Sequence, residues 1–154
     1  MCRKFLAQLR EFHHIFTENG AELSVIAPSS GSVIKEFNRS FGPYPFSLYG
    51  DPKHEAYYDL GHIRMPKWKM AGMLAGGAAT KRLPSFFPSE KRQKQFVTKS
   101  MRTQDVYLQG GAWIVDKDGE LLYSHIDKNP MDHAPIDDMY RVLTNHRLFH
   151  MQKN

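Results

Sequence analysis

Hydrophobic residues in the first part of the chain recur with a helical period and then with the spacing of a strand. Between Arg3 and Ile15 they stand three or four positions apart, which predicts an amphipathic helix. The Asn19-Gly20 pair provides a turn, and the apolar residues of 21–27 predict a buried strand. The serine-rich segment that follows supplies N-cap residues for a helix over 33–41.

Two short elements are predicted after a cluster of breakers at 42–45. Residues 46–49 favour a brief strand. Asp51 is the expected N-cap of a helix over 53–60, and Pro52 suits its first turn because that turn leaves backbone N–H groups without helical partners. The first sixty residues therefore read as alternating helices and strands.

From about residue 62 to residue 105 the periodic pattern is weakest. Residues 67–79 have helical spacing, but glycines within them weaken it, and 83–88 are rich in aromatic residues and proline. We interpret this stretch as an irregular insertion. At 154 residues, 41% hydrophobic and 24% charged, the chain is expected to form a single domain over 1–154.

The strongest local pattern is a β-hairpin near the C-terminus. Two apolar runs, 110–116 and 120–126, are joined by Lys117-Asp118-Gly119, and an Asp-Gly pair between such runs is typical of a tight turn. A final helix is predicted from Pro135 to about Leu143. The order of elements predicts an α/β domain that ends in a hairpin and a covering helix.

The charge and the apolar runs limit the expected partners. The net charge is +5, but much of the basic excess lies between Lys67 and Arg102, where it reads as a solvated surface rather than a nucleic-acid interface. No apolar run approaches the length of a membrane span, and charges interrupt any signal-peptide core. The expected location is therefore the cytoplasm, without a membrane partner. A basic nucleic-acid-associated protein is the third and weakest interpretation.

Cys2, the single cysteine, stands where the first helix is expected to begin. Unpaired backbone N–H groups and the positive end of the helix dipole favour the thiolate there, and Arg3 adds to that field. Cys2 is therefore the candidate nucleophile and Arg3 its candidate electrostatic support. The alternatives are a terminal thiol without a role and a solvated arginine.

The histidines offer weaker candidates. Asp132-His133 is an adjacent acid–imidazole pair, but neighbouring side chains rarely aim at each other, so Asp132 is interpreted as an N-cap ahead of the last helix. His125 is interpreted as a satisfied sheet histidine. His146 and His150 could bind a metal only if helical and preorganised, so no metal site is predicted.

Four stretches resemble the peroxiredoxin-like AhpC/TSA antioxidant enzymes of the thioredoxin-like superfamily. The resemblance covers nearly the whole chain and is most specific near the C-terminus. The stretches are Cys2-Arg3-Lys4 before the first helix, residues 21–26, residues 49–52 with 57–61, and residues 109–115 with His125 and 129–136. The resemblance implies a thioredoxin-like fold, a mixed sheet flanked by helices, and thiol-dependent redox chemistry without an organic cofactor or metal.

Two departures from that family qualify the expectation. Similar proteins carry a central strand and a Cys-x-x-Cys pair before the first helix, and Cys2 matches the second cysteine. We therefore expect an N-terminally incomplete sequence, whose preceding segment supplies the strand and a cysteine three residues before Cys2. Where peroxiredoxins place an arginine, this chain has Gln109, Gly110 and Gly111. Glycines allow a substrate to approach closely but bring no charge.

The leading hypothesis is thus a thiol–disulfide or peroxide enzyme that acts through Cys2. Gln109, Gly110 and Gly111 are its expected substrate-binding residues, and the expected partners are small thiols, peroxides or a protein disulfide. The alternative is a non-catalytic thioredoxin-like binding module that has lost its active-site strand.

Overall fold

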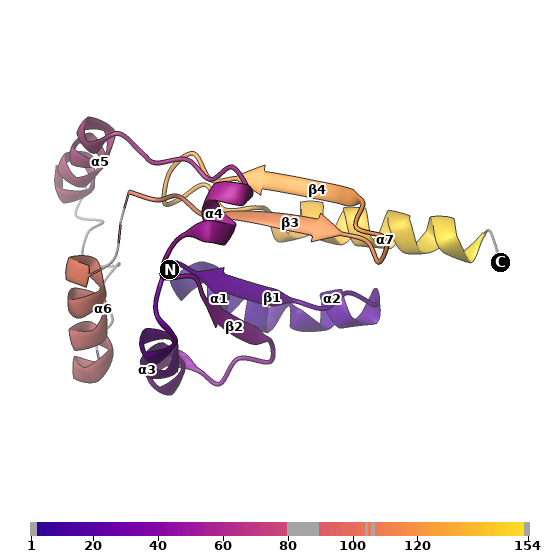
Figure 1. Cartoon of the computed structure of the whole chain (residues 1–154), viewed down its shortest axis with the longest axis horizontal. Helices are drawn as coiled ribbons and strands as arrows, with labels where there is room; N and C mark the ends of the chain where they lie inside the picture. Colours follow the sequence, from indigo (N-terminus) through magenta and orange to yellow (C-terminus); the bar gives the residue numbers. More distant parts are fainter. Residues whose placement is uncertain (1–2, 80–89, 104, 106, 153–154) are drawn as a thin grey trace. The chain divides into compact units, whose positions relative to one another are not determined.

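The computed structural model describes residues 3–79, 90–103, 105 and 107–152. Its elements alternate as an α/β protein (Figure 1), and the predicted α/β class is confirmed. In chain order they are α1 (Arg3–Glu11), α2 (His13–Glu18), β1 (Ser24–Ala27), α3 (Gly31–Phe41), β2 (Ser47–Gly50), α4 (Glu55–Asp59), α5 (Lys67–Ala79), α6 (Lys91–Thr103), β3 (Gly111–Val115), β4 (Leu121–Ile126) and α7 (Ile136–Met151).

The chain divides into two compact units. The first comprises Met1–Val25, Tyr44–Leu48 and Gly110–Asn154, and the second comprises Ile26–Pro43 and Tyr49–Gln109. Among the described residues, β1 pairs with β2 in one two-stranded sheet, and β3 pairs with β4 in another. The single domain expected from length remains a prediction.

The first predicted helix is interrupted. Phe12 has φ −95° and ψ 14°, outside the regular helical region, so the segment forms α1 and then α2 rather than one helix to Ile15. The predicted apolar face is nevertheless buried, with Leu6, Leu9 and Phe16 each at most 4% exposed. The turn expected after it is confirmed, because Gly20 has φ +74°.

Two predicted boundaries were wrong in the middle of the chain. α3 begins at Gly31, not at residue 33, and its N-cap Ser30 makes no side-chain capping bond. α4 covers only Glu55–Asp59, because His54 has φ +62° and breaks the helix predicted from residue 53. The N-cap is therefore His54 rather than Asp51, and Pro52 lies outside the helix, although the Asp51 carboxylate accepts a hydrogen bond from the Glu55 amide at 3.0 Å.

The segment predicted as an irregular insertion contains two regular helices, α5 and α6. α6 packs against α3, and Phe96 is the buried centre of this contact, with its ring 5.7 Å from that of Phe37 and 5.8 Å from that of Phe41. Aromatic pairs at such distances add to the stability that burial of their surface provides. The proline-rich residues 83–88 lie outside the described residues.

The hairpin is confirmed. β3 and β4 are antiparallel, with Trp113 opposite Ser124 and a local irregularity between Ile114 and Val115. Asp116 fixes the turn, because its Oδ1 accepts hydrogen bonds from the amides of Glu120 at 2.8 Å and Asp118 at 2.9 Å. These bonds, that of Glu120 above all, hold the pKa of Asp116 below its ordinary value.

The last helix is longer than predicted. α7 continues to Met151, about two turns beyond Leu143, and packs on β4 and on α2 (Figure 1). Its buried side chains are Met139 and Leu143. In the extension, Arg147 donates a hydrogen bond to the Glu18 carbonyl at 2.6 Å, which ties the end of α7 to the end of α2.

We expect the 154-residue chain to self-associate through its strands. In the described residues β1 pairs with β2 alone and β3 pairs with β4 alone, so the other edge of β1 and of β3 has no strand beside it. Strand edges of this kind are templates for pairing between chains. Val115 at the end of β3 is 61% exposed. Sedimentation velocity should show a mass that rises with concentration, and Val115→Lys should lower it, because an edge charge opposes pairing.

The matched control is Leu148→Lys, which adds the same charge at a comparably exposed position of α7, outside any strand. This variant should associate as the parent chain does. A monomer at every concentration, or equal effects of the two lysines, would show that the strand edges do not drive association.

Candidate functional site

The candidate nucleophile Cys2 lies outside the described residues. Arg3, which follows it, is the first residue of α1, and the first turn of this helix contains no acidic residue. The charge of Arg3 acts together with that of Arg10 on Tyr44. Burial raises the pKa of Tyr44, and the two arginines, Arg10 first, oppose that rise. The support of Cys2 by Arg3 remains a prediction.

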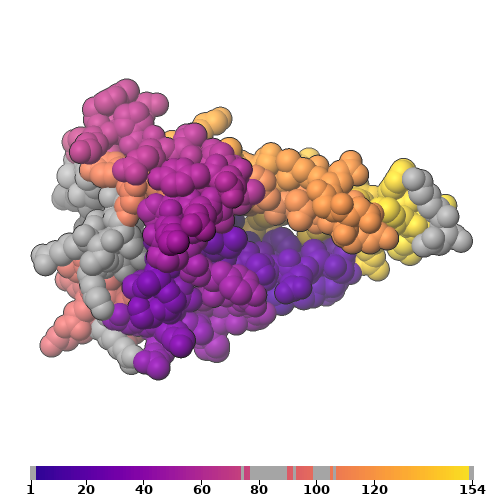
Figure 2. Space-filling view, viewed as in Figure 1, coloured from indigo at the N-terminus to yellow at the C-terminus, as the bar shows by residue number. Residues whose placement is uncertain are grey.

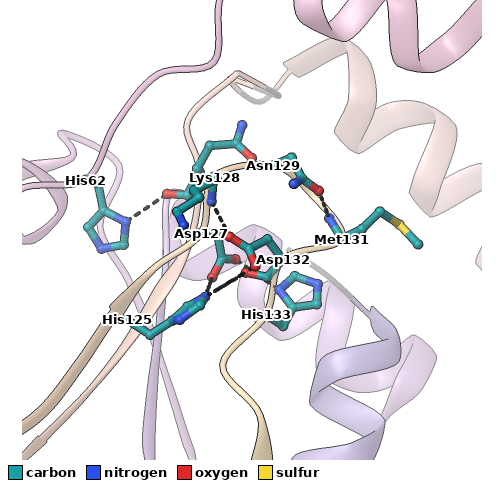
Figure 3. Close-up of polar contacts among 9 residues, drawn as sticks. His62, His125, Asp127, Lys128, Asn129, Met131, Asp132 and His133 are labelled. Carbon is teal, nitrogen blue, oxygen red and sulfur yellow. Dashed lines mark hydrogen bonds and ion pairs between the residues drawn. The ribbon is translucent and has the colours of Figure 1, made fainter.

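An aspartate–histidine pair follows the hairpin in the same unit (Figure 3). Asp127 comes directly after β4, and its Oδ2 lies 2.9 Å from Nδ1 of His133. The Asp127 side chain is 6% exposed and that of His133 is 20% exposed. A buried carboxylate at hydrogen-bond distance from an imidazole fixes the ring's orientation and favours a proton on the facing nitrogen.

A second histidine, His125 of β4, lies beside the Asp127–His133 pair. Its Nε2 lies 2.9 Å from the carbonyl oxygen of Asp132 and 3.6 Å from Oδ1 of Asp127 (Figure 3). The interpretation of His125 as a sheet histidine with a satisfied ring fits this contact. The group as a whole places two imidazoles around one buried carboxylate.

The loop that carries His133 is braced by its own polar groups. The Asp132 carboxylate accepts a hydrogen bond from the Lys128 amide at 2.9 Å, and Asn129 Oδ1 accepts one from the Met131 amide at 2.9 Å. The interpretation of Asp132 as an N-cap was wrong, because α7 begins after Pro135 without a side-chain cap and Asp132 closes the loop instead.

The first helix is joined to this group by an aromatic contact. The ring of Phe5, in the first turn of α1, stacks on the ring of His133 with centroids 4.8 Å apart and planes 17° apart. The Asp127–His133 pair therefore lies against the first turn of the helix that Cys2 precedes in the sequence.

The three predicted substrate-binding residues have structural contacts. Gln109 is 3% exposed, and its side-chain amide donates a hydrogen bond to the Tyr107 carbonyl at 2.8 Å. A Cβ on Gly110 would lie 2.9 Å from Asp127 Oδ2, and a Cβ on Gly111 would lie 2.5 Å from the His125 carbonyl oxygen. Close packing within the fold thus accounts for both glycines, and their substrate-binding role remains a prediction.

Gln109 is also a partner of a histidine that the sequence did not single out. In the second unit, Nδ1 of His62 lies 2.7 Å from the Gln109 carbonyl oxygen, and the His62 ring contacts that of Tyr57 at 4.3 Å. The backbone amide of Gln109 donates a hydrogen bond to the carbonyl oxygen of Ile63 at 2.9 Å. No sequence motif indicates this pairing, because His62 and Gln109 are 47 residues apart.

The partner of His133 was also missed in the sequence. Sequence neighbours suggested Asp132, but the loop reverses direction and brings Asp127 to the ring instead. The available signal was the position of Asp127 directly after an apolar strand, where the end of the strand fixes a side chain in place.

The described residues offer neither a metal cluster nor a membrane-spanning helix. No group of three or more His, Cys, Asp or Glu side chains there is arranged to hold a metal ion. No helix in that part of the chain is both long and apolar enough to cross a bilayer.

Two comparisons with known proteins point to the same family. A family model described as AhpC/TSA antioxidant enzyme matches residues 8–129, a range that begins after Cys2 and Arg3. Peroxiredoxin-like 2C of Takifugu rubripes is 25% identical over 154 aligned positions, which cover 88% of this chain. The chain spans 61% of the length of that relative.

Proposed function

Because this chain belongs to the AhpC/TSA antioxidant enzyme family, we propose that it carries out thiol–disulfide exchange through Cys2. The observation that carries the proposal is the basic first turn of α1, which contains Arg3 and Lys4 and no acidic residue, and which Cys2 precedes in the sequence. A helix start of this kind favours the thiolate, which is the attacking form of cysteine.

The exchange needs an external disulfide and a second thiol. The Cys2 thiolate attacks one sulfur of a disulfide, the S–S bond breaks, and a mixed disulfide forms as one thiolate leaves. The mixed disulfide is then resolved in one of two ways. A thiolate of another molecule attacks it and releases Cys2 as thiolate, or the cysteine expected in a preceding segment attacks it, releases the substrate and leaves a disulfide with Cys2. The partners are therefore small thiols or a protein disulfide.

Disulfide exchange is favoured over peroxide reduction by the charge near Gly110. The segment 109–111 contains no cation that could stabilise a peroxide, and the Asp127 carboxylate lies against Gly110. Both reactions put negative charge on the leaving atom, but the oxygen anion left by a peroxide is more basic than a thiolate and depends more on a nearby cation for its stabilisation.

A non-catalytic binding module is the second candidate. The observation in its favour is that Gln109, Gly110 and Gly111 are all engaged in packing or hydrogen bonds within the fold. Such a module would use the thioredoxin-like scaffold without a reactive thiol.

Replacing Cys2 with serine separates the two candidates. We expect Cys2→Ser to abolish glutathione-dependent reduction of insulin disulfides, because serine cannot form the mixed disulfide. In the parent chain, alkylation of Cys2 by iodoacetamide should titrate about one pH unit below the 8.5 of a free cysteine. Arg3→Ala should move that midpoint part of the way back.

The control is the circular dichroism and thermal unfolding of Cys2→Ser, which should match those of the parent chain. Insulin reduction that persists in the serine variant would remove the redox assignment and leave the binding module.

A further inference from the structure

The end of α7 brings two histidine rings together. His146 and His150 are four residues apart on the helix, a spacing that places side chains on one face, one above the other. Their Nε2 atoms lie 3.1 Å apart, and their ring centroids 4.4 Å apart. The condition that the sequence left open, a helical and preorganised pair, is met.

The separation of the two nitrogens suits a shared metal ion. Zinc binds imidazole nitrogen at about 2.0–2.1 Å, so two nitrogens on one tetrahedral ion lie roughly 3.3 Å apart. The observed 3.1 Å requires only a small adjustment of either side chain. Neutral imidazole carries one lone pair, and a cation between the rings can use the lone pairs of both Nε2 atoms.

One carboxylate and the C-terminal end of the helix favour a cation at this pair. Asp116 Oδ2 lies 3.9 Å from His146 Nε2, while its Oδ1 is occupied by the amides of the hairpin turn. His150 stands in the last turn of a helix of 16 residues, where the helix dipole is negative and favours a cation.

The pair is also accessible. The His146 side chain is 30% exposed, and His150 is exposed together with its neighbours Phe149 and Met151. The space-filling view shows this end of α7 at the surface (Figure 2). An ion can therefore reach both rings and keep water in its other coordination positions.

We propose that His146 and His150 form a two-histidine binding site for a divalent transition-metal ion, with Zn²⁺ as the probe. Imidazole suits Zn²⁺, Cu²⁺ and Ni²⁺ and disfavours Mg²⁺ and Ca²⁺, which take oxygen ligands. The Asp116 carboxylate supports the ion through its charge or through a bound water. The site is independent of the proposed chemistry of Cys2.

The test is calorimetric titration of the tag-free full chain with Zn²⁺, carried in a Cys2→Ser background so that the thiol does not compete. We expect one ion per chain. His146→Gln or His150→Gln should each weaken binding at least about tenfold, whereas Asp116→Asn should weaken it less. Zn²⁺ should raise the unfolding temperature of the Cys2→Ser chain, but not that of either glutamine variant made in it.

Two controls address composition and geometry. His150→Gln combined with Met151→His keeps the number of histidines but moves one to a spacing of five, off the shared face, and should also lose binding. His13→Gln and His14→Gln, at adjacent positions on α2, should retain it. Cu²⁺ bound to the Cys2→Ser chain should give an electron paramagnetic resonance spectrum with two coordinated nitrogens.

The alternative is that one ring only donates a hydrogen bond to the other. In that case both glutamine variants would unfold at a lower temperature in EDTA while Zn²⁺ affinity stayed unchanged, and the proposal would be overturned. Absence of Zn²⁺ binding, or equal affinity in the spacing variant, would overturn it as well.

Discussion

Replacing Asp127 with alanine should lower the free energy of unfolding by about 3 kcal/mol, measured by urea denaturation. The carboxylate is 6% exposed and lies 2.9 Å from His133 and 3.6 Å from His125. Removing one partner of a buried polar pair leaves the other without its hydrogen bond, which costs more than the bond itself contributes.

Two variants make this expectation specific. Asp127→Asn keeps the shape and an oxygen acceptor, and should cost less than the alanine variant. Asp132→Ala removes an acid of the same loop whose side chain is 32% exposed, and should cost about 1 kcal/mol. If Asp127→Ala cost no more than Asp132→Ala, the aspartate–histidine pair would not be a stabilising centre of the unit.

The second large effect is expected at Gly111. An added Cβ would lie 2.5 Å from the His125 carbonyl oxygen and 2.5 Å from Cη2 of Trp113, so the paired strands must separate or the indole must move. Gly111→Ala should therefore lower the free energy of unfolding by roughly 2–3 kcal/mol, the usual cost of overpacking.

Gly72 in α5 provides a control of opposite sign. Nothing lies within 4 Å of a Cβ at this helical position, so Gly72→Ala should leave stability unchanged or raise it by up to about 1 kcal/mol. If Gly111→Ala lost insulin reduction at full stability, Gly111 would act on the substrate rather than in the packing of the hairpin.

The sequence predicted best those elements whose signals are local. The hairpin follows from two apolar runs and one Asp-Gly turn, all within 17 residues, and its strands agree with the prediction to within one residue at each end. The buried face of α1 likewise follows from spacing alone. Such elements can be predicted from their own residues, because turn geometry and hydrophobic periodicity depend on positions close together in the sequence.

Elements that depend on distant contacts were predicted less well. The extension of α7 beyond Leu143 is tied down by the bond from Arg147 to Glu18, 129 residues away. α5 and α6 were obscured by glycines and by a highly polar sequence, and α6 is held through Phe96 against α3. Tertiary packing outweighs local propensity in these cases.

The candidate site shows the same division. Cys2, Arg3 and the glycines were singled out by residue type and position, which sequence reveals directly. The pairing of Asp127 with His133 and that of His62 with Gln109 depend on how loops reverse, so neither could be read from spacing. The N-cap role of Asp132 failed for the same reason.

The hairpin is closed at both ends. At its turn, Asp116 binds the amides of Asp118 and Glu120, and at its open end the Asp127 amide donates to the Gly110 carbonyl at 3.0 Å. A hairpin usually frays from its open end, and local opening there admits solvent one pair at a time. With both ends fastened, we expect β3 and β4 to open as one cooperative unit, so that the amide protons bonded between the two strands exchange with solvent at a common, slow rate.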